Sequence, residues 1–209
     1  MRRILFSTLL LTVIIGTGNA QSTTDTKNMM DRVSKKLQSY KTIKADFTFT
    51  LENEEEAIND TQEGSLILAG DKYLLNLMSI VAICNGETLW TVNEELKEAN
   101  IIDPAENDLF NPKSIFTLYE KKFSYEPVRS TPEIAVVDLI PLEKEAAYSK
   151  IRMEIIRAKD QIAEVTYFST DGNQYIITIK SLNTNLSADD KMFVFDSKQY
   201  PGIKVFDMR

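Results

Sequence analysis

The side chains that could do chemistry in this chain are carboxylates and a single thiol. The 209 residues include no histidine, one cysteine and 31 acidic residues. Without histidine there is no histidine-based catalytic triad, no histidine-containing zinc site and no histidine general base. Two carboxylates held across a cleft can hydrolyse a glycoside, and Asp46 with Glu52 is one such pair in the sequence.

The acidic residues fall on polar strand faces or in turns, where solvated charges are normal. Gly-rich phosphate loops, Walker motifs, nucleophile elbows and Cys–His metal spacings do not occur. Cys84 ends an apolar run and cannot form an intrachain disulfide, so we expect a buried structural thiol rather than a reactive one. We therefore predict that the chain is not an enzyme and has no catalytic residue, metal site or cofactor.

The first 20 residues have the pattern of a cleavable secretory signal. Arg2 and Arg3 form a basic start, and Leu5–Ile15 is an apolar stretch too short to span a membrane. Small residues precede a cleavage point after Ala20. An uncleaved membrane anchor is the alternative, but we expect cleavage, export and a single domain over residues 21–209.

The charge of the chain limits its partners. The formal net charge is −7, and it becomes more negative when the two arginines of the signal leave. Such a chain is poorly suited to nucleic acid, because nothing offsets phosphate repulsion. It is equally unsuited to anionic membrane surfaces. We expect no nucleic-acid partner and a monomer.

The elements that would position a site begin with a helix and a long strand. Residues 25–40 predict an amphipathic helix, with Met29, Met30, Val33 and Leu37 at helical spacing. Residues 43–52 alternate apolar and polar side chains, which predicts a strand with one wet face.

Residues 64–102 predict about five short strands joined by tight turns at 69–71, 85–86 and 93–95. Asn85-Gly86 between apolar runs favours a hairpin with a type I′ turn. These strands are apolar on nearly both faces. The sheet must therefore be covered on both sides or enclose something apolar.

The rest of the chain predicts one short helix and more strands. Asn111 and Pro112 open a helix over residues 111–119. Short strands joined by turns indicate an antiparallel meander, closed or curled to avoid free edges. We predict these strands over 123–128, 133–141, 151–155, 161–168, 175–179, 193–195 and 203–206.

Several of these segments match one family in order. They are Ala45–Thr48, Gly64–Leu68, Lys72–Leu75, Cys84–Trp90, Phe193–Phe195 and Tyr200–Arg209. In this order, after a cleavable signal, the chain resembles the periplasmic outer-membrane lipoprotein carriers of the Lol pathway, the LolA-like family. The resemblance implies a mainly β fold with helices (α+β). It would be an incomplete antiparallel β-barrel closed by an N-terminal helix and short lid helices.

The resemblance also implies a function without bond-making. The half-barrel would hold the acyl chains of lipoproteins and ferry them through the periplasm from the inner to the outer membrane. Its partners would be acylated lipoproteins, an inner-membrane lipoprotein-releasing ABC transporter complex and, where one exists, an outer-membrane acceptor.

The candidate site follows from the apolar strands and helices. Each candidate could also be ordinary barrel core, because the sequence leaves open which strand face looks inward. The candidates for the acyl-chain cavity are Phe47, Phe49, Leu66, Leu68, Tyr73, Leu75, Leu77, Trp90 and Met153. The candidates for an apolar lid are Met29, Met30, Val33, Phe116 and Leu118.

We expect an apolar lid because the chain differs from the family at one turn. Family members often carry Arg-Pro at the turn after the Gly-containing strand, and that arginine helps to hold the lid closed. This chain has Ala69-Gly70-Asp71 there, so apolar packing would have to replace it. Two other functions stay open: a sensor of mislocalised lipoproteins that signals through a partner, and a generic binder of periplasmic lipids.

Overall fold

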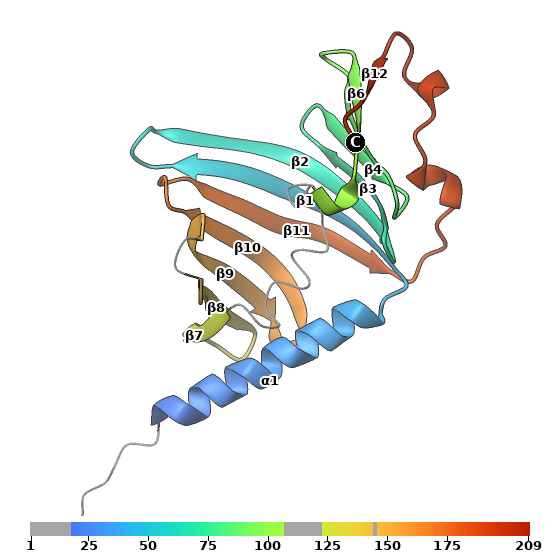
Figure 1. Cartoon of the computed structure of the whole chain (residues 1–209). Coiled ribbons are helices and arrows are strands. Elements are labelled where there is room, and N and C mark those ends of the chain that lie inside the picture. Colours follow the sequence, from blue (N-terminus) through green and yellow to red (C-terminus); the bar gives the residue numbers. More distant parts are fainter. Residues whose placement is uncertain (1–17, 107–122, 144–145) are drawn as a thin grey trace, which may run out of the picture.

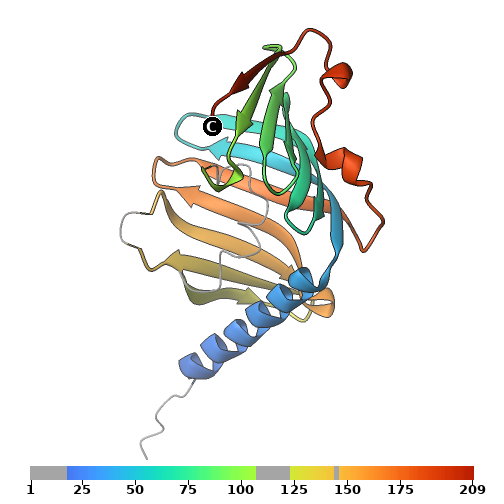
Figure 2. The ribbon, with the colours of Figure 1, turned by 45° about the vertical axis from the view of Figure 1, so that its right-hand side comes forward.

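The computed structural model describes residues 18–106, 123–143 and 146–209. They form one α-helix, twelve strands and short 3-10 turns. Figures 1 and 2 show a strongly curled sheet with the helix lying across one end of it. The predicted helix over 111–119 lies outside the described residues, as does most of the predicted signal.

The helix α1 spans Gly18–Ser39 and has one apolar side. Met30 and Val33 are fully buried, and Met29 and Leu37 nearly so, at the helical spacing that the sequence predicts. The helix begins seven residues before the predicted start at Asp25. The predicted cleavage point after Ala20 therefore falls within its first turn. None of the helices in the described ranges is both long and apolar enough to cross a membrane.

All twelve strands belong to one sheet, in the order β12-β6-β5-β4-β3-β2-β1-β11-β10-β9-β8-β7. Two long strands at its centre, β1 and β2, pair along their whole length. The first six strands are β1 (Thr42–Asn53), β2 (Ile58–Ala69), β3 (Lys72–Leu77), β4 (Ile80–Cys84), β5 (Leu89–Asn93) and β6 (Glu98–Ile102). The other six are β7 (Phe123–Ser130), β8 (Ile134–Pro141), β9 (Tyr148–Ile156), β10 (Gln161–Ser169), β11 (Gln174–Thr184) and β12 (Lys204–Asp207).

The sheet does not close into a barrel, because β12 and β7 each pair on one side only. The predicted half-barrel is thus confirmed as an open, mainly antiparallel sheet with an N-terminal helix. At one free edge, β7 carries Pro127 and a bulge between Pro127 and Arg129. Proline and bulges blunt an edge against pairing with another strand.

The end of the chain departs from the predicted meander. The strand β12 runs parallel to its neighbour β6, not antiparallel. The strand predicted over 193–195 is wrong, since Asp190–Phe193 forms the 3-10 turn η3 and Ser197–Gln199 the turn η4. Asp189 and Asp196 cap these turns by accepting backbone N–H groups two residues on, at 3.0 Å each.

The hairpin at Asn85-Gly86 is confirmed, but its turn type differs from the prediction. Cys84 pairs with Leu89 across a four-residue loop. The side chain of Asn85 accepts the N–H groups of Glu87 and Thr88 at 2.9 and 2.8 Å. Only Gly86 has a positive φ there, so an Asx-type loop replaces the type I′ turn.

The register defines two faces of the sheet. We call inner face the side that carries Phe47 and the residues in line with it, and outer face the other side. Most of the main hydrophobic core lies between the inner face and the apolar side of α1. The outer face of β1 carries Lys44, Asp46 and other polar residues, as the alternation in the sequence predicts.

Candidate ligand-binding surface

Eight of the nine predicted cavity residues lie on the inner face. Phe47 stands opposite Gly64, and Leu66 and Leu68 stand opposite Leu75 and Tyr73. On the other half of the sheet, Phe49 pairs with Ile177, Ile177 with Val165 and Val165 with Met153. Residues two positions apart on one strand point to the same face of the sheet, and so do residues that stand directly opposite on paired strands. Six antiparallel strands therefore bring the eight predicted residues onto one continuous apolar surface: Phe47, Phe49, Leu66, Leu68, Tyr73, Leu75, Leu77 and Met153.

This surface has a closed part and an accessible part. Phe47, Leu66, Leu68, Tyr73 and Met153 are at most 8% exposed. A second set is only partly buried and packs against that core. We call this set the inner belt; it consists of Phe49, Leu75, Leu77, Ile177 and Ile179.

The belt is apolar surface that the described fold leaves partly uncovered. Within it, Phe49 stacks on Tyr175 of β11 with ring centroids 6.2 Å apart. Burial, with Cys84 as a lesser cause, raises the pKa of Tyr73 well above its ordinary value. The shift reflects how fully the phenol is packed in the core.

Gly64 has a specific role beneath Phe47. A Cβ placed on Gly64 would lie 2.4 Å from two ring carbons of Phe47. The aromatic ring thus covers the glycine of the neighbouring strand, an arrangement that fixes cross-strand register. No other side chain could stand at position 64 without moving the ring.

Trp90 is the exception among the predicted cavity residues. It pairs with Ile83, and both point to the outer face. Strands β3–β6 are apolar on both faces. The alternation of apolar and polar residues therefore could not show whether Trp90 or Leu89 points to the inner face. Leu89, its neighbour, is the residue of β5 that joins the main core.

The outer face of β3–β6 has its own cover. Phe193 in η3 is fully buried, and so are Val92 and Ala99, while none of the three belongs to the main core. The turn η3 contacts β3 and β4, and Lys72 of β3 bonds Asp190 at 2.9 Å. Figure 1 shows this C-terminal segment, in red, beside β3 and β4. Strands apolar on both faces are therefore covered on the outside by the chain's own end.

The described part of the predicted lid packs into the core. Met29, Met30 and Val33 are at most 4% exposed and belong to the main core. Phe116 and Leu118 lie outside the described residues. At the turn Ala69-Gly70-Asp71, Gly70 adopts a φ of 61°.

Polar contacts also tie α1 to the sheet, at the turn between β9 and β10. The guanidinium of Arg32 donates to the carboxylate of Asp160 at 3.3 Å. Lys36 donates to the carbonyl oxygen of Lys159. Sequence reasoning missed this contact, because no local pattern joins residues so far apart along the chain.

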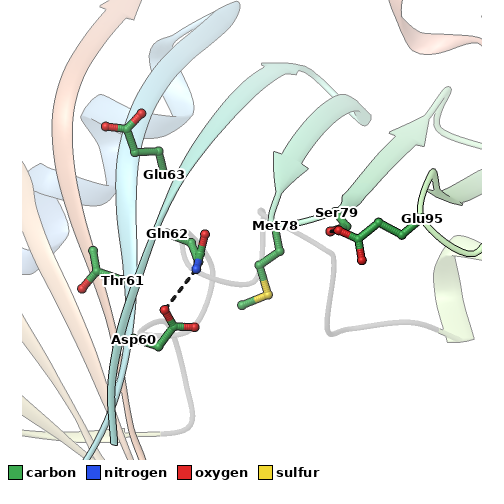
Figure 3. A pocket seen from close by; sticks show the side chains of 7 residues that line it. All are labelled: Asp60, Thr61, Gln62, Glu63, Met78, Ser79 and Glu95. Carbon is green, nitrogen blue, oxygen red and sulfur yellow. Dashed lines mark hydrogen bonds between the residues drawn. The ribbon is translucent and has the colours of Figure 1, made fainter.

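A polar hollow lies beside one end of this surface, where Gln62 stands opposite Phe49, and its lining does not suit acyl chains. It measures about 690 Å³ and lies between the first half of β2 and the turn after β3, near Met78 and Ser79 (Figure 3). Asp60, Glu63 and Glu95 contribute three carboxylates. In the described ranges, no group of acidic residues and cysteine has the arrangement of a metal site.

The carboxylate pair that left glycoside hydrolysis open is not a pair in space. Asp46 and Glu52 lie six residues apart on the same strand β1. At the rise of a β-strand this separates them by about 20 Å, beyond the roughly 5–9.5 Å that glycosidases use. Asp46 instead accepts a hydrogen bond from the hydroxyl of Ser181 at 2.7 Å.

These features define the class of protein: an open half-barrel with a partly exposed apolar inner face and an N-terminal helix packed against it. A family model described as "Outer membrane lipoprotein carrier protein LolA" matches residues 38–196. The chain belongs to the LolA family.

The chain is also similar to individual proteins. An outer-membrane lipoprotein carrier protein of Coxiella burnetii is 23% identical over 172 residues, which cover 78% of this chain and 81% of the relative. A conserved protein from Thermus thermophilus superposes with a TM-score of 0.52 at 10% identity, over 88% of this chain and 99% of that one. A LolA superfamily protein from Nitrosomonas europaea has a TM-score of 0.44 at 9% identity, over 81% and 97%.

Proposed function

We propose that this protein is a periplasmic carrier that binds the acyl chains of lipoproteins on its inner face and ferries them from the inner to the outer membrane. The main support for the proposal is the inner belt: partly exposed apolar side chains on an open sheet, next to the buried apolar side of α1. Membership of the LolA family supports the same role. The role needs no catalysis, in line with the lack of histidine.

The energetics suit a carrier. Each acyl methylene that leaves water contributes about 0.8 kcal/mol, so a few acyl chains give a stable complex. Release requires a second state of similar free energy, to which an acceptor supplies the bias. The apolar contacts of α1 are the part of the described fold that such a change of state would alter.

The other parts of the proposal follow from this role. The signal at residues 1–20 would export the chain to the periplasm. An inner-membrane lipoprotein-releasing ABC transporter complex would load it, and an outer-membrane acceptor, where one exists, would unload it. Met29, Met30 and Val33 would act as the described part of an apolar lid over Phe49, Leu75 and Leu77.

Depletion of the protein in its own cell tests this function. We expect acylated lipoproteins to accumulate in the inner membrane after depletion, as measured by membrane fractionation. A wild-type copy should restore their location, and so should a Lys44→Gln copy, which changes only an exposed outer-face residue. If lipoproteins still reach the outer membrane after depletion, this result would contradict the carrier role and favour a sensor or a generic lipid binder.

A further inference from the structure

A line of aromatic rings crosses the inner face and begins in the inner belt. Phe49 of β1 stacks on Tyr175 of β11 with ring centroids 6.2 Å apart. Tyr175 stands directly opposite Tyr167 of β10, and the ring of Tyr167 meets that of Tyr148 of β9 edge-on at 6.1 Å. Tyr148 in turn stacks on Phe123 of β7 at 6.2 Å. We call these five residues the aromatic strip.

The aromatic strip and α1 lie toward opposite ends of β10. Arg32 and Lys36 of α1 hold the turn just before β10, at Lys159 and Asp160 (Figure 1). Tyr167 follows Asp160 by seven residues, which is about 20 Å at the rise of a β-strand. The contacts that tie the helix to this turn are therefore far from the strip.

The hydroxyl groups of the strip are accessible although its rings are packed. Tyr148, Tyr167 and Tyr175 are each half-buried. Within the described ranges their hydroxyls make no hydrogen bond, and the one fully buried side-chain donor without a partner there is Nε of Arg157. The three hydroxyls are therefore unpaired and open to solvent. A tyrosine of this kind offers a polar group at the margin of an apolar surface.

The surroundings of these hydroxyls favour a neutral ligand. Burial, with Tyr148 as a lesser cause, raises the pKa of Tyr167 well above its ordinary value. Burial and, to a lesser extent, the carboxylate of Glu143 raise the pKa of Tyr148. Both shifts mean that a negative charge is disfavoured at this place. A carboxylate ligand would meet the same penalty, whereas an uncharged carbonyl oxygen can accept a hydrogen bond from a phenol without it.

We propose that the aromatic strip recognises the ester and amide carbonyl groups at the head of bound acyl chains. The hydroxyls of Tyr148, Tyr167 and Tyr175 donate to the carbonyl oxygens, and the chains continue from Phe49 along the inner belt. This inference rests on the proposed function, because it assigns the polar end of the same ligand. It adds a specificity: the protein selects acyl esters and amides over free fatty acids and over alkyl chains without a carbonyl group.

Three ligands that share the dodecyl skeleton test this specificity on the whole exported protein. They are the ester dodecanoylglycerol, the ether dodecylglycerol, which lacks the carbonyl group, and the anion dodecanoate. Displacement of a fluorescent hydrophobic dye measures each affinity. We expect the ester to bind about threefold to tenfold more tightly than the ether, the gain from one neutral hydrogen bond. The ester should also bind more tightly than dodecanoate.

Tyrosine-to-phenylalanine substitutions locate the effect, because they remove a hydroxyl and keep the ring. Tyr148→Phe combined with Tyr167→Phe should reduce the preference for the ester to less than about twofold and leave the affinity for the ether unchanged. Tyr175→Phe alone should reduce the preference in part, and it serves if the double variant does not fold. The matched control is Tyr200→Phe, at a half-buried tyrosine that stacks on Phe195 in the C-terminal segment; it should keep the full preference.

Three results would overturn the inference: equal affinity for ester and ether, tighter binding of dodecanoate than of the ester, or a preference that the double variant and Tyr175→Phe both retain in full. In each of these cases acyl or alkyl chains still bind, so the proposed function stands. Failure of all three ligands to bind would overturn the inference and the proposed function together.

Discussion

Leu74 and Leu75 are neighbours on β3, both are half-buried, and they face opposite sides of the sheet. Leu75 belongs to the inner belt, whereas Leu74 faces outward. The proposal gives the two side chains different roles although their chemistry and burial are alike. This pair is therefore a matched test of which face binds.

Leu75→Asn should weaken the binding of an acylated peptide at least about tenfold, because a polar amide replaces apolar contact area in the ligand's path. Leu74→Asn should leave that affinity within about twofold while costing similar stability. Equilibrium titration of each variant with a fluorescent lipopeptide measures both effects. Equal losses in the two variants would show that the inner face has no special role.

Gly64 makes a second prediction at the scale of single residues. Gly64→Ala should destabilise the fold by about 1–3 kcal/mol, since the new methyl group overlaps the ring of Phe47. Urea unfolding measures the change. As a control, Gly70→Ala meets no neighbouring atom within 4 Å and is strained only by its φ of 61°. A Gly64→Ala variant as stable as wild type would mean that the ring moves freely.

At the scale of elements, strands β8 and β9 are joined on the outer face by a charge network. Arg152 donates to Asp138 at 2.7 and 2.8 Å, and Lys150 donates to it at 3.0 Å. Burial alone would raise the pKa of Asp138, but the hydrogen bonds from Arg152 and Lys150 outweigh it and hold that pKa below its ordinary value of 3.8. Both cations also lie over the ring of Phe168.

This network should contribute stability that depends on pH. A carboxyl whose folded pKa is lowered stabilises the fold at all pH values above its unfolded pKa. That contribution disappears as the pH falls through the lowered value. Asp138→Asn should therefore cost about 1–3 kcal/mol at pH 7 and progressively less below pH of about 4. Urea unfolding at a series of pH values measures it, and a cost independent of pH would contradict the account.

The helix α1 is held by apolar packing more than by charge. Arg32 is 56% exposed in its ion pair with Asp160, and such pairs contribute about 0–1 kcal/mol. Met30→Ala should cost about 2–5 kcal/mol, because Met30 is fully buried. It should also speed release of a bound acyl probe, whereas Arg32→Gln should barely change either quantity. Stopped-flow release and urea unfolding give both numbers; a larger effect from Arg32→Gln would make charge the main lid contact.

At the scale of the whole molecule, most of the architecture could be predicted from sequence. The alternation of apolar and polar residues in β1 and the helical spacing of apolar residues in α1 each predict a buried side. Both elements and both buried sides are confirmed. Residues 64–102 carry turn residues that mark five strands. The inner face of β1–β3 follows from the same alternation, which brought Phe47, Leu66 and Tyr73 together.

The failures share a physical cause. Trp90 lies on the outer face of β5, and Phe193 belongs to the C-terminal segment that packs on the outer side of this part of the sheet. This packing depends on contacts between distant parts of the chain. Where both faces of a strand are apolar, the alternation of side chains does not show which face points inward. The parallel pairing of β12 and the contact of Arg32 with Asp160 are likewise long-range, so no local pattern encodes them.

The central claim is that the open half-barrel carries an acylated lipoprotein. Native mass spectrometry of the protein, purified gently from the cells that make it, tests this most directly. The account predicts a complex whose added mass is that of a triacylated lipoprotein, lost in Leu75→Asn and kept in Leu74→Asn. A protein that carries only free fatty acid or another lipid, or a signalling protein in place of a lipoprotein, would contradict it.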